Sequence, residues 1–146
     1  MKKVELAYIA GLIDGEGCIY TFPRYQKREL TGTYIIGVTV QMTDKEAILL
    51  LQQGFGGNIH FKAERKGNRK PLYHWQLTNY KALPLLLAIK PYLIIKRMKA
   101  DIAIRMLQGH SKWRRFTPME KFLQEADAKA IKVLNKRGIQ KSTLTI

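Results

Sequence analysis

The spacing of apolar residues changes several times along the 146-residue chain, and each change predicts a different element of structure. Helix-like spacing occupies the first segment and most of the last third, whereas the alternation typical of strands dominates the middle. The pattern predicts helices over 4–13, 47–53, 81–89, 93–108 and 117–136. It predicts strands over 18–28, 33–40, 58–64 and 72–78.

Local signals sharpen several of these boundaries. Pro23 cannot donate a ladder hydrogen bond, so the first strand should be an edge strand or carry a bulge there. Residues 30–32 (Leu-Thr-Gly) are expected to form the turn into the second strand. Thr43 and Glu46 have the spacing of a capping box, and Thr117 is expected to cap the last helix in the same way.

The order of elements is α-β-β-α-β-β-α, followed by further helices. This order favours an α+β fold in which an antiparallel sheet carries helices on one face. The length allows a substantial core, so we expect one domain over 1–146.

The other face of the predicted sheet is polar. Because side chains alternate along a strand, Ile59 and Phe61 should point to one side of the second hairpin and polar side chains to the other. The residues expected on the polar face are Arg24, Gln26, Arg28, His60, Lys62, Glu64, His74 and Gln76. A two-stranded ribbon of this kind fits the major groove of DNA, although a polar sheet face that simply meets water is the alternative. Both faces of the strand over 33–40 are partly apolar, so its DNA-facing side is not defined.

Charge decides between these alternatives. The chain has 26 Lys and Arg against 11 Asp and Glu, which gives a net charge of +15. Such an excess suits a polyanionic partner, and nucleic acid fits better than a membrane surface because no apolar run is long enough to span a bilayer. The single cysteine, Cys18, and the lack of a secretion signal favour a reducing, intracellular compartment.

The segment from Tyr8 to Gly17 (YIAGLIDGEG) needs a chemical explanation. Asp14 and Glu16 follow a helix whose carboxyl end already carries partial negative charge, which disfavours both carboxylates. A bound Mg²⁺ would remove that penalty, because hard cations prefer carboxylate and phosphate oxygens. Small residues in the same helix would let a second helix approach closely, so two copies could present two acids to a duplex.

These residues resemble the signature of the LAGLIDADG homing endonucleases in their single-motif, homodimeric form. The sequence IAGLIDGEG departs from that signature at Ile9, Gly15 and Glu16, and Glu16 replaces acid with acid. The resemblance extends from Val4 to about Lys141 and includes the predicted order of elements. It implies an αββαββα fold whose sheet forms a DNA-binding saddle, and site-specific hydrolysis of both DNA strands at a pseudo-palindromic target of roughly 20 base pairs.

The resemblance also implies roles for individual residues. Glu16, with Gly15, would bind the metal; Gln41 would position the attacking water; and Lys96, with Lys45 as a further basic residue, would lie near the scissile phosphate. The metal would be Mg²⁺, with Mn²⁺ able to replace it and Ca²⁺ supporting binding without cleavage. The dimer interface would comprise Tyr8, Ala10, Gly11, Ile13 and Asp14. A C-terminal phosphate-binding loop over 135–143 would include Lys136, Arg137 and Lys141.

Two other functions compete with DNA cleavage. A maturase-like protein would bind intron RNA, and a transcription regulator would bind DNA without a metal or cleavage. An acid at position 16 favours catalysis, since a protein that only binds has no need for it there. His60 and His74 alone make a weak zinc site, because they lack Cys partners at ligand spacing.

Overall fold

The computed structural model describes residues 1–63, 66–67, 69–109 and 115–136. In these residues α1 (Lys3–Glu16) is followed by β1 (Gly17–Gln26), β2 (Glu29–Met42), α2 (Lys45–Phe55), β3 (Asn58–Lys62) and β4 (Leu72–Thr78). Short 3-10 turns (Asn79–Lys81 and Lys90–Tyr92) flank α3 (Ala82–Ile89), and α4 (Arg97–Gln108) and α5 (Pro118–Leu134) complete the described chain. The predicted α+β order is therefore confirmed.

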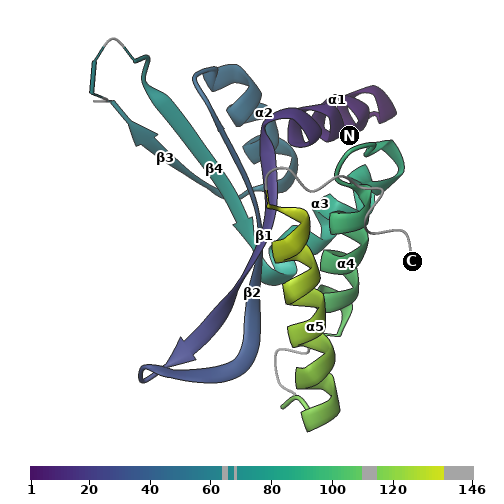
Figure 1. Ribbon diagram of the computed structural model, residues 1–146. Helices are drawn as coiled ribbons and strands as arrows, with labels where there is room; N and C mark the ends of the chain where they lie inside the picture. The colour runs from purple at the N-terminus through teal and green to yellow at the C-terminus, as the bar shows by residue number, and fades with distance from the viewer. Residues whose placement is uncertain (64–65, 68, 110–114, 137–146) are drawn as a thin grey trace.

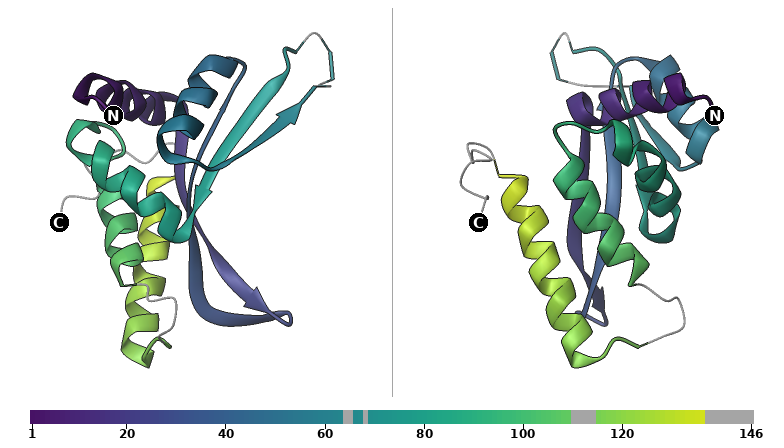
Figure 2. Two further views of the ribbon diagram at one scale, coloured as in Figure 1. Left: turned by 180° about the vertical axis from the view of Figure 1, so that it is seen from behind. Right: turned by 90° about the vertical axis from the view of Figure 1, so that its right-hand side faces the viewer.

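The four strands form one antiparallel sheet in the order β1-β2-β4-β3. Figures 1 and 2 show every helix on the same side of this sheet, while the other side is open and the two hairpins spread apart from each other. This is the predicted saddle. β1 is an edge strand, and its pairing with β2 shifts register between Pro23 and Tyr25, as the proline predicted.

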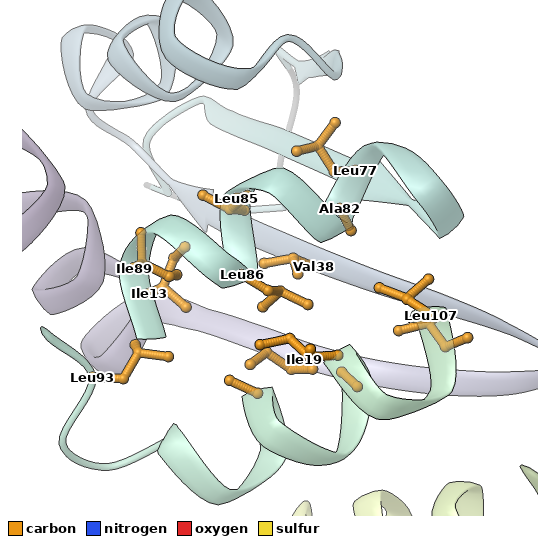
Figure 3. Close-up of a cluster of buried hydrophobic side chains, with 14 of the residues drawn as sticks. Ile13, Ile19, Val38, Leu77, Ala82, Leu85, Leu86, Ile89, Leu93 and Leu107 are labelled. Carbon is orange, nitrogen blue, oxygen red and sulfur yellow. The ribbon is translucent and has the colours of Figure 1, made fainter. Parts of the chain in front are cut away.

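The core fills the space between the sheet and the helices. Figure 3 shows Ile19 and Val38 from the sheet among the leucines and isoleucines of α3 and α4. Trp75 of β4 is also completely buried, and its indole N–H donates to the carbonyl of Gly56, 2.8 Å away. Burial of these side chains fixes which face of each strand meets the helices, and so fixes which face stays open.

Several predicted boundaries are wrong. The first helix does not end at Ile13 but continues through Asp14 to Glu16. The first hairpin turns at Lys27 and Arg28, which both have positive φ, and not at 30–32, because Gly32 takes its positive φ inside β2. The cap of α2 is Asp44, one residue after Thr43, and it accepts a hydrogen bond from the Ala47 N–H at 3.0 Å. The helix predicted from residue 93 begins only at Arg97.

Candidate functional site

The open face of the sheet carries the polar side chains that alternation predicted for the second hairpin. In the pairing register, His74 of β4 lies between Gln41 of β2 and His60 of β3. In the same way, Gln76 of β4 lies between Thr39 of β2 and Asn58 of β3. The neighbouring residues of opposite phase, such as Trp75 and Val40, are completely buried against the helices. The polar side chains of β3, β4 and the end of β2 therefore form continuous rows across the open face. Lys62 continues this face on β3, whereas Glu64 lies outside the described residues.

His74 is fixed within one of these rows. Its Nε2 lies 2.5 Å from Thr39 Oγ1, and that hydroxyl also donates to the carbonyl of Trp75 at 3.0 Å. With its proton committed to the carbonyl, Thr39 accepts from His74. Burial lowers the pKa of His74, and nearby His60 and Lys62 lower it further, so the ring stays neutral at neutral pH.

The first hairpin presents its cations differently from the prediction. Arg24 lies at the register shift of β1 and is exposed, and Gln26 is the last residue of that strand. Arg28 does not share their strand, because it forms the hairpin turn with Lys27. The turn therefore places two adjacent cations at the tip of the hairpin.

The same hairpin carries an apolar zone that polar alternation could not reveal, formed by Tyr20, Phe22 and Ile35. The register pairs Tyr20 with Gly37 and Phe22 with Ile35, and the intervening Ile36 is in the core. The rings of Tyr20 and Phe22 are stacked, with centroids 5.9 Å apart and planes inclined by 6°. Burial raises the pKa of the Tyr20 hydroxyl, with a smaller contribution from Cys18, so it remains protonated at neutral pH.

Asp14 joins α1 to the segment that precedes α4. Its Oδ2 accepts from the backbone N–H groups of Ile94 (2.7 Å) and Ile95 (3.2 Å), and its Oδ1 accepts from that of Lys96 (2.9 Å). The Lys96 ammonium donates to the Asp14 backbone carbonyl. Burial would raise the pKa of Asp14, but the three N–H groups and the Lys96 charge outweigh it and lower the pKa.

Glu16 differs from Asp14 because it is exposed. The Lys96 side chain lies close enough to Glu16 for the two groups to interact electrostatically. Burial lowers the pKa of Lys96, and its interactions with Asp14, Cys18 and Glu16 oppose that shift. Gln41 lies at the same end of the sheet, since Gly17 pairs with Val40 and these two residues adjoin Glu16 and Gln41. The structure thus brings the three predicted catalytic residues to the junction of α1 and the sheet. Lys45 is exposed in the first turn of α2, close in sequence to this junction.

The exposed side of α1 contains only part of the predicted dimer interface. Ala10 and Ile13 are completely buried and Asp14 is 9% exposed, so the chain's own elements already enclose them. Tyr8 is 53% exposed, and Gly11 is exposed as well. Val4 (79% exposed) and Gly15 extend this side of the helix in both directions.

No group of three or more His, Cys, Asp or Glu side chains gathers into a metal site within the described residues. At the junction, one copy of the chain provides two kinds of oxygen ligand for a metal: the Glu16 carboxylate and the Gly15 carbonyl. Mg²⁺ prefers about six oxygen ligands and keeps several waters, so this donor set fits only when phosphates or a second acid complete it.

The predicted phosphate-binding loop is only partly described. Lys136 is exposed directly after α5, and Arg137 and Lys141 lie outside the described residues. Asn135 donates its side-chain N–H to the carbonyl of Ile19 at 2.9 Å, which attaches the end of α5 to the edge strand β1. In the described part of the chain, no helix has the length and apolar character needed to cross a membrane.

The saddle-shaped sheet, with α1 ending at its edge and the remaining helices behind it, is the fold of the LAGLIDADG homing endonucleases. The chain is similar to the homing endonuclease I-CvuI in complex with a target of I-CreI (19% identity, TM-score 0.74, over 94% of this chain and 87% of that one). It is similar to the archaeal intron-encoded homing endonuclease I-Vdi141I complexed with DNA (16% identity, TM-score 0.75, over 97% and 90%). It is also similar to the LAGLIDADG homing endonuclease I-GzeII in complex with its DNA target (12% identity, TM-score 0.64, over 94% and 47%). No protein-family model matches the sequence, and no curated protein does.

Proposed function

We propose that this chain is a single-motif LAGLIDADG homing endonuclease: a site-specific, Mg²⁺-dependent enzyme that cuts double-stranded DNA as a homodimer. The observation that carries the proposal is the junction where exposed Glu16 lies beside Lys96 and Gln41, at the end of a basic, concave sheet. The similar solved structures are homing endonucleases in complex with DNA, which agrees with this reading.

Each residue of the junction has a distinct role in this proposal. Glu16 and the Gly15 carbonyl would hold the metal, which would lower the pKa of a bound water and stabilise charge on the phosphate oxygens. Gln41 can hydrogen-bond a water molecule and orient it. Lys96 supplies positive charge next to the scissile phosphate, and its reduced pKa makes its proton easier to give up than that of an exposed lysine.

The homodimer is supported by the glycines of α1. A glycine inside a helix costs about 1 kcal/mol relative to alanine. A Cβ atom at Gly11 or Gly15 would meet nothing within 4 Å, so the packing of one copy does not require either glycine. Close approach of a second α1 gives both a reason.

The test is a selection from a randomised duplex-DNA library, with Mg²⁺ or Ca²⁺, for the parent and for Glu16→Gln. We expect discrete cut ends at one pseudo-palindrome with Mg²⁺, bound but uncut DNA with Ca²⁺, and binding without cutting for Glu16→Gln. Glu46→Gln, which neutralises another exposed helix acid, should cut like the parent. Cutting by Glu16→Gln at the parent's rate would refute the metal assignment, and stronger binding of structured RNA than of duplex DNA would favour the maturase-like function.

The dimer is tested by substitution at Gly11. Gly11→Trp has room in a single copy but would separate two α1 helices, so it should produce monomers in sedimentation analysis and abolish cutting. Ala126→Trp, at an exposed position on α5, is the matched control and should leave the mass unchanged. A parent protein that sediments as a monomer at the concentrations where it cuts DNA would contradict the proposal.

A further inference from the structure

The apolar zone formed by Tyr20, Phe22 and Ile35 lies on the open face, between two polar regions. Toward the junction with α1, the next row contains Cys18, Thr39, Gln76 and Asn58, as the pairing register gives it. Toward the hairpin tip, the next side chains are Arg24 at the register shift and the two cations of the turn. The zone is therefore an apolar interval in a surface that is otherwise suited to hydrogen bonding.

Gly37 lets the Tyr20 ring lie against the sheet, because it has no side chain. A Cβ atom at Gly37 would lie only 2.4 Å from the Cζ and Oη atoms of Tyr20, so the tip of the tyrosine ring occupies the space above the glycine. Phe22 stacks parallel to that ring and is 44% exposed. The exposed apolar surface thus lies along the sheet, which suits contact with a flat edge and does not suit insertion between bases.

An exposed apolar surface on a DNA-binding face has one well-defined counterpart in the major groove. Base edges there present donors and acceptors, and thymine alone among the standard bases presents a C5-methyl group. Polar side chains recognise the donors and acceptors, whereas phenylalanine and aliphatic side chains recognise the methyl group. The stacked rings and Ile35 have no hydrogen-bonding atom at their exposed apolar surface except the Tyr20 hydroxyl, which lies over Gly37.

We propose that the apolar zone recognises pyrimidine C5-methyl groups in each half-site, so that this chain prefers thymine there and accepts 5-methylcytosine in its place. This inference rests on the proposed function, because it assumes that the open face binds duplex DNA. Phe22 is five residues along β1 from Gly17, and with about 3.3 Å per strand residue and about 3.4 Å per base step the contact falls about five base pairs from the catalytic junction.

The expected preference is modest and measurable. Burial of one methyl group contributes about as much as one methylene, which corresponds to about a fourfold change in Kd. Uracil has the same hydrogen-bonding edge as thymine and lacks only the methyl group. Replacement of thymine by uracil at the contacted position should therefore weaken binding about fourfold per methyl, with no effect at positions read by the polar rows.

The experiment uses two randomised duplex libraries, one synthesised with thymine and one with uracil, and selection for binding in Ca²⁺. We expect a thymine preference about five base pairs outward from the cut position in each half-site, and this preference should disappear in the uracil library. Phe22→Gln should remove this preference in the thymine library, whereas Phe22→Leu, which keeps an apolar side chain, should retain it. Phe122→Gln, the same change at an exposed position of α5, is the matched control and should also retain it.

The outcomes separate this inference from the proposed function. Identical base preferences in the two libraries, or an unchanged thymine preference in Phe22→Gln, would overturn methyl recognition while the selected target still supports a sequence-specific DNA-binding protein. Failure to select any sequence from the thymine library would overturn both. Equal binding of a target with 5-methylcytosine at the thymine position, and weaker binding with unmodified cytosine, would support the inference directly.

Discussion

Replacement of Asp14 by asparagine tests whether the first acid of the motif stabilises the fold. Asp14 is 9% exposed and accepts three backbone N–H groups, from Ile94, Ile95 and Lys96. Asparagine has nearly the same shape but has one acceptor oxygen and no charge. Its NH₂ group would face an N–H donor, so one bond is lost and the others become neutral.

The size of the effect follows from the number of bonds. A hydrogen bond to a charged acceptor contributes about 1.5–3 kcal/mol and a neutral bond about 0.5–1.5 kcal/mol. Loss of one charged bond and weakening of two others should lower the free energy of unfolding of Asp14→Asn by about 3.5–6 kcal/mol. That is a large share of the roughly 5–15 kcal/mol that stabilises an ordinary domain.

Urea denaturation, followed by circular dichroism, measures this loss. Asp44→Asn is the matched control, because Asp44 caps α2 through one hydrogen bond, at 3.0 Å, and asparagine caps a helix equally well. We expect a change of a few tenths of a kcal/mol at most for the control. If Asp14→Asn were as stable as Asp44→Asn, the structural role of Asp14 would be refuted.

The dependence on pH gives an independent check. The pKa of Asp14 is lowered in the folded state from the usual 3.8, because its N–H donors and Lys96 outweigh the effect of burial. The folded state therefore binds this proton less readily than the unfolded state, so the stabilisation is present above the usual pKa and is lost as pH falls below it. The difference in stability between the parent and Asp14→Asn should shrink as the pH falls through 3.8 and below it.

Further predictions concern the open face. Lys27→Asn with Arg28→Gly should raise the free energy of unfolding by about 1–2 kcal/mol, because both residues have positive φ. The double substitution should also make the slope of log Kd against log salt shallower by about 2 per protomer. An unchanged slope would exclude phosphate contacts at the turn. Gly37→Ala should displace the Tyr20 ring and lower the free energy of unfolding by about 1–3 kcal/mol, measured in urea; unchanged stability would refute the close approach. Burial lowers the pKa of His74, and nearby His60 and Lys62 lower it further. The stabilisation that this residue gives should therefore be present above the usual pKa of 6.5 and decline as pH falls below it, and His74→Gln should remove this part of the pH profile.

The elements of the fold could be predicted because local signals mark them. Pro23 predicted the irregular edge strand, and Thr117 caps α5 in a capping box with Glu120, as expected. The position of the first hairpin turn could not be predicted, because Gly32 is the ordinary choice for positive φ and the turn instead uses two cations with positive φ. Rules based on propensity do not predict a turn whose residues adopt conformations that they disfavour.

The candidate site was only partly visible for a similar reason. Alternation identified the polar side chains of β4 because their apolar neighbours Trp75 and Leu77 are buried, and those of β3 follow from the register with β4. It missed the apolar zone of Tyr20, Phe22 and Ile35, because apolar residues on both faces of a strand give no sign of which face is open. The close contact between Tyr20 and Gly37 shows which face these residues share. That contact depends on a pairing register that one strand alone does not define.

The two acids at the end of α1 show most clearly what long-range contacts add. From the sequence, Asp14 and Glu16 share the same unfavourable position at a helix carboxyl end. In the fold, the Asp14 carboxylate accepts hydrogen bonds from the backbone N–H groups of residues 94–96. These hydrogen bonds also explain why α4 begins at Arg97 and not at Leu93. Asp14 is therefore compensated within the chain, while Glu16 remains exposed beside Lys96. An acid that the fold leaves accessible and close to a cation is the one suited to bind a metal and a phosphate, so we expect the two substitutions to separate: Asp14→Asn should mainly lower stability, and Glu16→Gln should mainly abolish cutting.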